Sequence, residues 1–227
     1  MKAKINKNKK IILFTISLLV FFLILIDVFR TDVTRYDNWA YSIFVENLRN
    51  DSMTTIMKII TEFGNVFIML FIIILLFFKE KKQSLYASVN MCLIFIINSI
   101  VKVIVQRPRP SGYNLINESN FSFPSGHSMV STAFYGFLIY LIYKNVKNKK
   151  TKYTLISLLF ILIMLICISR IYLGVHYLSD TLAGFFLSIS YLMVFISVIP
   201  ILEKNIKTKS NKEWSILWMR SIVAILI

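Results

Sequence analysis

"VFIMLFIIILLFFKEKK", residues 66–82, is an apolar run that ends in a cluster of lysines. With the apolar residues that precede it from Ile56, the run is long enough to cross the roughly 30 Å hydrocarbon layer of a membrane. Lysines directly after such a run are typical of a loop that stays in the cytoplasm. This stretch therefore predicts a transmembrane helix that ends on the cytoplasmic side.

The composition of the whole chain agrees with a membrane protein. Its 227 residues are 57% hydrophobic and have a mean hydropathy of +0.70, which is too apolar for an ordinary soluble domain. The net charge of +15 could suggest a nucleic-acid partner, but the lysines form short runs between apolar segments rather than one basic face. We therefore predict no nucleic-acid partner. Cys92 and Cys167 lie inside apolar runs, and we interpret both as packing residues.

Six apolar stretches are candidates for membrane spans, and they predict an all-α, six-transmembrane-helix bundle over residues 1–203. The fourth and fifth stretches are short and need their polar flanks to complete a crossing. The stretches are Ile11–Phe29, Ile56–Phe78, Leu85–Val105, Met129–Tyr143, Tyr153–Ile168 and Leu178–Leu202.

Two further segments are interpreted as interfacial. Residues 31–55 have mixed charge and include the aromatic residues Tyr36, Trp39 and Tyr41, and are predicted to form a short amphipathic helix on the outer leaflet. Residues 204–227 are predicted to be a cytoplasmic or interfacial tail. Its apolar end, residues 214–227, is shorter than a span, so it is either an interfacial helix or the start of a helix that the chain does not complete.

The distribution of charge predicts the orientation. If the amino terminus lies in the cytoplasm, the inner segments hold eighteen of the 26 basic residues and three acids, so the whole net charge of +15 lies on that side. Lysine-rich loops are retained in the cytoplasm, which favours this assignment. The connections between the third and fourth helices and between the fifth and sixth then face outward.

Ionisable residues gather at the outer ends of the last four predicted helices. Such groups are costly near membrane depth, so they usually mark function. Both histidines of the chain belong to this group. Its members are Lys102, Arg107, Arg109, His127, Arg170, His176 and Asp180. Their common depth and side predict a single site.

Each of these residues also has an ordinary structural explanation. Cations near helix ends can snorkel to the headgroups, and arginines beside prolines can belong to an extended loop. A Pro-Ser-Gly turn commonly starts a helix. His176 and Asp180, at i and i+4, could be a solvated ion pair worth about 0.3 kcal/mol. These explanations do not account for the common location of the whole group.

The chemistry of the group favours a phosphate substrate. Lys102, Arg109 and Arg170 would form a clamp for a multiply charged oxyanion, since guanidinium groups match phosphate geometry. Ser125 and Gly126 open the fourth helix, and the N–H groups at a helix start also attract an anion. The sequence therefore predicts a phosphate cradle built from several helices.

The two histidines are predicted to divide the chemistry between them. Asp180, one helical turn after His176, can accept the Nδ1 proton and leave Nε2 free to attack. Nearby cations lower the pKa of His176 and Asp180 raises it, which favours a neutral nucleophile. His127 is then left to protonate the departing oxygen.

Three sequence elements carry a resemblance to a known family. Lys102 with Arg109-Pro110 fits K-x6-RP, residues 124–127 are PSGH, and residues 169–180 fit SR-x5-H-x3-D. In this order the elements resemble those of the type-2 phosphatidic acid phosphatase superfamily, in its six-helix integral membrane branch. The tandem "RPRP" allows two registers, and spacing assigns the family position to Arg109 and makes Arg107 accessory.

The resemblance implies a metal-independent phosphatase of lipid phosphates or diphosphates, with no cofactor. His176 would attack phosphorus and form a phosphohistidine, Asp180 would orient it, and His127 would act first as acid and then as base. The phosphate would be bound by Lys102, Arg109, Ser125, Gly126 and Arg170. The acids of the chain do not group at metal-ligand spacing.

We therefore expect a hydrolase of the cell membrane, with its active site on the extracytoplasmic face. Undecaprenyl diphosphate is the first expectation for the substrate because an outward site suits recycling of that carrier. Phosphatidylglycerophosphate and phosphatidic acid are the other candidates. The alternatives are a phosphotransferase that passes the phosphoryl group to another lipid and a non-enzymatic lipid-binding or transport protein. The sequence gives no indication of the oligomeric state.

Overall fold

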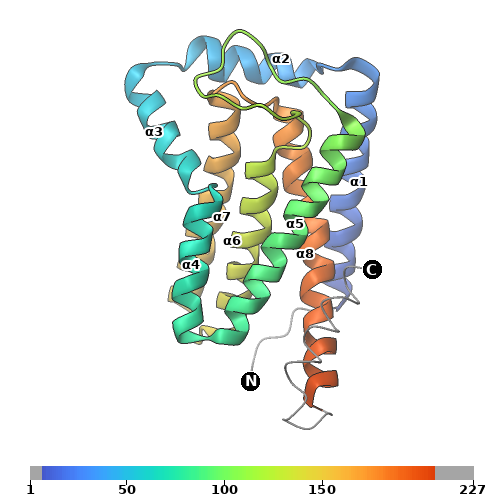
Figure 1. Cartoon of the computed structure of the whole chain (residues 1–227), viewed down its shortest axis with the longest axis vertical. Coiled ribbons are helices and arrows are strands. Elements are labelled where there is room, and N and C mark those ends of the chain that lie inside the picture. Colours follow the sequence, from blue (N-terminus) through green and yellow to red (C-terminus); the bar gives the residue numbers. More distant parts are fainter. Residues whose placement is uncertain (1–6, 208–227) are drawn as a thin grey trace.

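The computed structural model describes residues 7–207, with side chains as far as Glu203. Within this range every regular element is a helix, so the predicted all-α fold is confirmed (Figure 1). The helices are α1 (Lys7–Thr31), α2 (Arg35–Tyr41), the π-helix η1 (Ser42–Asn47), α3 (Asp51–Glu62), α4 (Val66–Lys79), α5 (Lys81–Val105), α6 (Gly126–Asn145), α7 (Lys149–Tyr172) and α8 (Leu178–Lys207).

The helices give fewer candidate membrane crossings than the six apolar stretches predict. Among residues 7–207, four helices are long and apolar enough to cross a membrane: α1, α5, α7 and α8. A fifth crossing is present if the bent pair α3 and α4 counts as one span. α6 does not qualify, because its first two turns carry small polar residues such as Ser128, Ser131 and Thr132. The predicted count of six is therefore not confirmed.

The second predicted span, Ile56–Phe78, is divided between two helices that meet at an angle of 46°. Asn65 starts the second of them, since its side chain accepts a hydrogen bond from the backbone N–H of Phe67 at 3.1 Å. The Tyr135 hydroxyl on α6 donates to the carbonyl of Phe63 at 2.6 Å, which ties the break to the bundle. Gly64 lies against His127, where a Cβ would come within 2.8 Å of the imidazole.

α6 lies at the centre of the bundle and packs against α5, α7 and α8. Its residues Met129, Ala133, Phe134 and Phe137 are fully buried. Polar contacts join the helices as well as apolar packing: the Asn90 side chain on α5 donates to the Ala133 carbonyl at 2.9 Å. Because α6 is central, its first residues, from Gly126 onward, lie in the middle of one end of the bundle.

That end of the bundle is covered by α2 and by the long connection 106–125 (Figure 1). The short helix expected in residues 31–55 corresponds to α2. One side of α2 packs on the rest of the protein and the other side is exposed. Asp37 and Ala40 are buried, whereas Trp39 is 60% exposed. The chain then turns into α3 at Asp51, before the predicted start of the second span.

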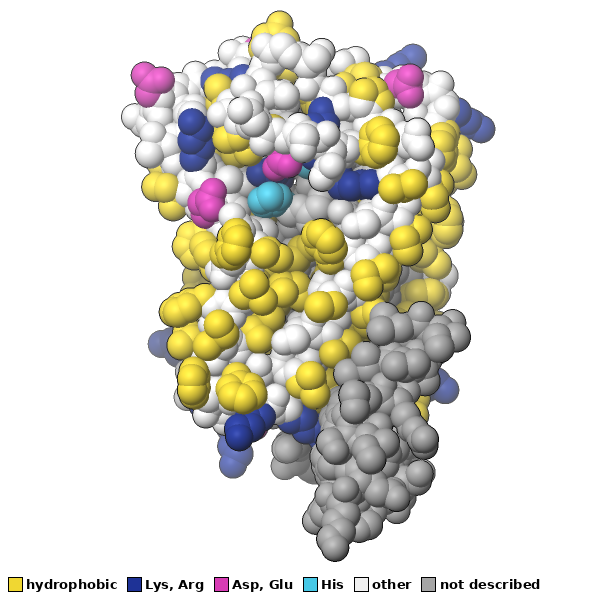
Figure 2. Space-filling model, viewed as in Figure 1, with side chains coloured by type: hydrophobic (Ala, Val, Ile, Leu, Met, Phe, Trp, Pro, Cys, Tyr) yellow, Lys and Arg dark blue, Asp and Glu magenta, His cyan; other side chains and the backbone are white. Residues whose placement is uncertain are grey.

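The opposite end of the bundle carries lysines. Lys79, Lys81 and Lys82 flank the tight α4–α5 turn, and Lys82 pairs with Glu203 of α8 at 3.0 Å. Between the two ends, Figure 2 shows hydrophobic side chains over the visible face, with basic residues below them. α8 continues past the predicted boundary at residue 203 to Lys207. The predicted tail from residue 208 onward lies outside the described residues.

The two cysteines do not form a disulfide. Cys167 is buried and Cys92 lies on the exposed face of α5, and both are free. The interpretation as a packing residue is therefore confirmed for Cys167, whereas Cys92 does not pack in the interior.

Candidate active site

The first wall of the site is the end of α5 with the connection that follows. Lys102 lies in the last turn of α5, and Gln106, with φ of 51°, ends the helix in the left-handed conformation. The Lys102 ammonium donates to the carbonyl of Phe121, so it holds the far end of the same connection. The Arg109 guanidinium donates to the carbonyls of Asn120 at 2.5 Å and Val175 at 2.9 Å. These bonds fix the connection over the site.

The second wall is the start of α6. Ser125 is fully buried and caps the helix, because its side chain accepts from the Ser128 N–H at 3.4 Å. The Ser125 N–H donates to the backbone carbonyl of Asp180 at 3.0 Å, which ties the turn to α8. Gly126 faces Asn98 of α5, and a Cβ would lie 3.3 Å from the amide oxygen of that residue. The start of α6, where backbone N–H groups point out of the helix, therefore lies beside α5 and α8.

The third wall is the turn between α7 and α8. Gly174, with φ of 74°, lets the chain reverse sharply, and His176 and Asp180 follow on or just before α8. The Nδ1 atom of His176 lies 3.4 Å from the carboxylate of Asp180. The same carboxylate accepts the N–H of Tyr177 at 2.9 Å and a hydrogen bond from Ser122.

The contacts of His176 determine which of its nitrogens carries the proton. The Nη1 atom of Arg109 lies 3.1 Å from Nε2 of His176. A guanidinium group can only donate, so Nε2 is the acceptor and the proton is assigned to Nδ1, toward Asp180. Nε2 therefore keeps a free electron pair next to a cation, the state that a nucleophile requires.

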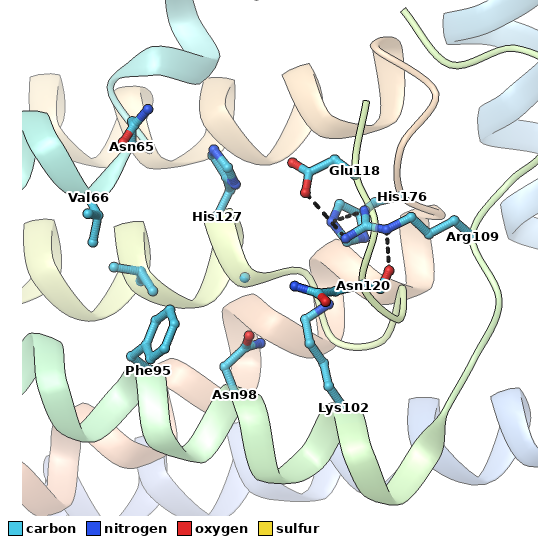
Figure 3. Close-up of a pocket in the computed structure, with 13 residues that line it drawn as sticks. Asn65, Val66, Phe95, Asn98, Lys102, Arg109, Glu118, Asn120, His127 and His176 are labelled. Atoms are coloured by element: carbon cyan, nitrogen blue, oxygen red, sulfur yellow. Dashed lines mark hydrogen bonds and ion pairs between the residues drawn. The ribbon is translucent and has the colours of Figure 1, made fainter. Parts of the chain in front are cut away.

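These walls enclose a cavity of about 270 Å³ (Figure 3). Five of the eight residues predicted for the site line it: Lys102, Arg109, Gly126, His127 and His176. Below them the lining becomes apolar, with Val66, Phe95 and Val130. In Figure 2 a histidine lies at the rim of a hollow directly above the hydrophobic surface. The cavity thus joins a cationic part to an apolar part.

The other three predicted residues, Ser125, Arg170 and Asp180, are buried behind the cavity lining. Arg170 is 1% exposed and donates to the Thr61 hydroxyl at 2.8 Å. Its second terminal nitrogen donates to Glu118, which does line the cavity. The Nε atom of Arg170 is buried without a hydrogen-bond partner. Arg170 thus does not line the cavity itself but is linked to it by its hydrogen bond to Glu118.

Arg107, read from the sequence as accessory to Arg109, does not line the cavity. It is 3% exposed and its guanidinium points toward α2 and α8, where it pairs with Asp37 and Asp180. The two arginines of "RPRP" therefore have separate surroundings, and Arg109 is the one beside His176.

The electrostatics of the cavity favour a neutral His176. Burial, together with the nearby Arg170 and Arg109, lowers the pKa of His176 to about 3, although the hydrogen bond and charge of Asp180 act to raise it. The imidazole is therefore unprotonated at neutral pH. The surrounding cations favour a bound anion, and a phosphate dianion that binds there would in turn stabilise protonated imidazole.

Glu118 is a site residue that the sequence analysis missed. Its carboxylate pairs with Arg109 at 3.5 Å and with Arg170, so it bridges two predicted phosphate ligands. Burial acts to raise the pKa of Glu118, but Arg170 and Arg109 outweigh it and hold the pKa below its usual value. The signal in the sequence was its isolation, since Glu118 is the only acid between Lys102 and Asp180.

The Glu118→Gln variant is expected to bind vanadate roughly tenfold more tightly, because an anion no longer competes with a carboxylate for the two arginines. Inhibition constants for vanadate measured on both proteins would check this. Ser119→Ala, an exposed change next to it, is the matched control. Unchanged or weaker vanadate inhibition would show that Glu118 does not occupy the anion site.

Comparisons with known proteins bear on this geometry. Residues 83–203 match the sequence pattern of the PAP2 superfamily. The chain is 33% identical over 190 residues to phosphatidylglycerophosphatase B of Bacillus subtilis (strain 168), an alignment that covers 80% of this chain and 91% of that protein.

Two solved structures are also similar. The crystal structure of a transmembrane PAP2-type phosphatidylglycerolphosphate phosphatase from Bacillus subtilis superposes with a TM-score of 0.74 at 29% identity, and covers 84% of this chain and 96% of that one. The crystal structure of Aquifex aeolicus LpxE superposes with a TM-score of 0.62 at 20% identity, and covers 73% of this chain and 97% of that one. The second match concerns the fold alone.

Proposed function

The chain belongs to the PAP2 superfamily of membrane lipid phosphatases, and from this premise we propose that it removes the terminal phosphate of phosphatidylglycerophosphate through a phosphohistidine at His176. It is a hydrolase and a multi-pass membrane protein. The observation that carries the proposed mechanism is the orientation of His176, with Nδ1 toward Asp180 and Nε2 toward Arg109 in the cavity. The support for the substrate comes from the names of the similar Bacillus subtilis protein and crystal structure.

In the first step, Nε2 of His176 attacks phosphorus as the bond from phosphorus to the glycerol oxygen breaks. His127, on the opposite wall, gives its proton to that oxygen, and the lipid leaves as an alcohol. Asp180 stabilises the imidazole as it gains positive charge. Lys102 and Arg109 stabilise the five-coordinate phosphorus through its equatorial oxygens.

In the second step, water attacks the phosphohistidine. His127, now neutral, takes a proton from the water, and the bond between phosphorus and Nε2 breaks to release inorganic phosphate. His176 regains its free electron pair and His127 its proton, so the enzyme returns to its starting state. Two displacements on one phosphorus replace a single difficult one.

The cavity fits a lipid phosphate better than a soluble one. Val66 at the start of α4 and Phe95 on α5 line its apolar part, below the cations. A lipid lying in the membrane could place its phosphate among the cations while its acyl chains stay against this apolar part and the hydrophobic surface below it (Figure 2).

In detergent, the purified protein is expected to release phosphate from phosphatidylglycerophosphate faster than from phosphatidic acid or undecaprenyl diphosphate. Undecaprenyl diphosphate was the first expectation from the sequence, but neither the similar Bacillus subtilis protein nor the crystal structure is named for it, so it is the competing substrate.

Among residues 7–207, no three His, Cys, Asp or Glu side chains lie close enough together to hold a metal. We therefore expect the same rates in EDTA.

The product of the assay separates the alternative functions. Free phosphate indicates hydrolysis, whereas a newly phosphorylated lipid would indicate phosphotransfer. Tight lipid binding without phosphate release would favour a binding or transport protein. A preference for undecaprenyl diphosphate would overturn the proposed substrate, and loss of activity in EDTA would overturn metal independence.

We also propose that the chain crosses the membrane six times, with the amino terminus in the cytoplasm and the site outside. Counting the α3–α4 pair as one crossing and adding α6 brings the total to six. The central position of α6 among α5, α7 and α8 supports its inclusion. The lysines at the α4–α5 turn favour this orientation.

A cysteine at Ser111, exposed in the connection over the site, is expected to react with an impermeant maleimide in intact cells. The change is best made with Cys92→Ser, because Cys92 is exposed and Cys167 is buried. A cysteine at Lys147, between α6 and α7, is the matched control and should react only after the membrane is opened. The reverse pattern would invert the topology.

A further inference from the structure

Arg107 forms a bridge between α2 and the predicted catalytic pair. One terminal nitrogen, Nη1, lies 2.6 Å from the Asp180 carboxylate, and the other, Nη2, lies 2.9 Å from the Asp37 carboxylate. Nη1 also donates to the Ser179 hydroxyl at 2.6 Å. The ring of Tyr177 lies against the guanidinium, whose central carbon is 4.2 Å from the ring centroid. These contacts hold the guanidinium of Arg107 in a single orientation.

Asp37 is itself fixed by contacts at both ends. It is 2% exposed, and it accepts hydrogen bonds from the N–H of Ser179 at 2.8 Å and from the Ser179 hydroxyl at 2.8 Å. It also accepts the N–H of Thr34 at 3.1 Å and so completes the capping box of α2. A helix of seven residues is thus joined to the first turn of α8 through a buried carboxylate.

The two oxygens of Asp180 have different partners. Oδ1 pairs with Arg107, whereas Oδ2 faces Nδ1 of His176 at 3.4 Å. Because a carboxylate is planar, fixing one oxygen fixes the direction of the other. The charges also balance, since one guanidinium lies between two buried carboxylates, and a buried carboxylate without a partner would be strongly destabilising. The carboxylates of Asp180 and Asp37 outweigh burial and raise the pKa of Arg107.

We propose that Asp37 and Arg107 are positioning residues, which hold Asp180 at the angle that directs Nε2 of His176 into the cavity. Neither residue lines the cavity, so neither contacts the substrate. The path runs from Asp37 of α2 through Arg107 to Asp180 and His176. α2 therefore supports Asp180 through Asp37, in addition to covering this end of the bundle. This inference rests on the proposed function, since it assigns His176 as the nucleophile.

The test compares Asp37→Asn, Arg107→Lys and the double variant with the wild-type protein in detergent, on the best substrate of the lipid panel. Asp37→Asn keeps the shape of the side chain and removes its charge. Arg107→Lys keeps the charge, but one ammonium cannot bridge both carboxylates. Arg35→Gln, an exposed change on the same helix, is the matched control.

We expect kcat to fall roughly tenfold in Asp37→Asn and roughly a hundredfold in Arg107→Lys, since misplacement of a reacting group by about 1 Å has effects of this size. KM and the inhibition constant for vanadate should change less than about twofold, because the anion ligands are intact. The double variant should lose less than the product of the two single losses, since both residues act through Asp180. Arg35→Gln should match the wild type.

Each outcome has one meaning. Unchanged kcat in both single variants, while the wild type is active, would overturn the positioning role and leave the phosphatase function in place. Losses that multiply in the double variant, or a fall in vanadate affinity as large as the fall in kcat, would also overturn it. Melting temperatures measured in parallel separate misfolding from misplacement. A wild type that releases no phosphate overturns the proposed function, and the positioning role with it.

Discussion

The His176→Ala variant is expected to release phosphate roughly 10⁴- to 10⁶-fold more slowly than the wild type, the scale of loss seen when a covalent nucleophile is removed. No other side chain of the described cavity lining is placed to replace it, since the Glu118 carboxylate is paired with Arg109 and Arg170. The Lys102 ammonium and the Arg109 guanidinium are cations without a free electron pair, and His127 lies on the opposite wall at the start of α6. Phosphate release from the lipid panel, measured over hours, gives the rate.

A loss of activity in His176→Ala supports the mechanism only if the variant protein is folded. His176 is 3% exposed, but within residues 7–207 its hydrogen-bond partners are only Arg109, Asp180 and Ser122, and each of these keeps other partners. The variant should therefore elute as the wild type does on size exclusion. Ser111→Ala in the exposed connection is the control for handling losses. Turnover at the wild-type rate in His176→Ala would refute the phosphohistidine mechanism.

The His127→Ala variant is expected to turn over roughly 10²- to 10⁴-fold more slowly, because it lacks the group that protonates the leaving oxygen and activates water. The two steps should respond differently to the leaving group. The glycerol alkoxide is a poor leaving group and needs the proton from His127. With phosphatidylglycerophosphate, the reaction of the variant should therefore stall before the phosphoryl group is transferred to His176. A nitrophenolate leaves without help, so para-nitrophenyl phosphate should still phosphorylate His176.

The intermediate should therefore accumulate in His127→Ala with the nitrophenyl substrate. A labelled phosphoprotein that is stable to base, labile to acid and absent from the double variant His127→Ala with His176→Ala would identify it. If no phosphoprotein forms in His127→Ala while wild-type turnover is normal, the division of roles between the two histidines is wrong.

Much of the site could be predicted from the sequence because local motifs carry it. The PSGH turn sets Ser125 at the cap of α6, and the spacing of four residues sets His176 beside Asp180. Apolar runs set the length of the helices that place these motifs at one end of the bundle. The structure brings the predicted residues around one cavity, while their roles stay predictions until the variants are made.

The parts that could not be predicted depend on long-range contacts. Asp37 meets Ser179 across 142 residues, and no periodic pattern in the sequence links α2 to α8. Arg107 and Arg109 are both arginines followed by a proline. Only the path of the connection gives them different partners, Asp180 for Arg107 and His176 for Arg109. The break in the second span had a local signal, Gly64-Asn65, which a count of apolar residues passes over.

The pairing of α1 with α8 has a consequence for how the protein is made. α1 packs mainly against α8, where the hydroxyls of Ser17 and Ser190 meet at 2.8 Å, and α2 then joins α8 through Asp37. A nascent chain that has inserted only its first helices lacks both His176, the proposed nucleophile, and the surface of α8 on which α2 rests. The predicted catalytic pair, His176 and Asp180, is therefore completed only when α8, the last helix of residues 7–207, enters the membrane, so we expect enzymatic activity in a newly synthesised sample to measure the insertion of α8.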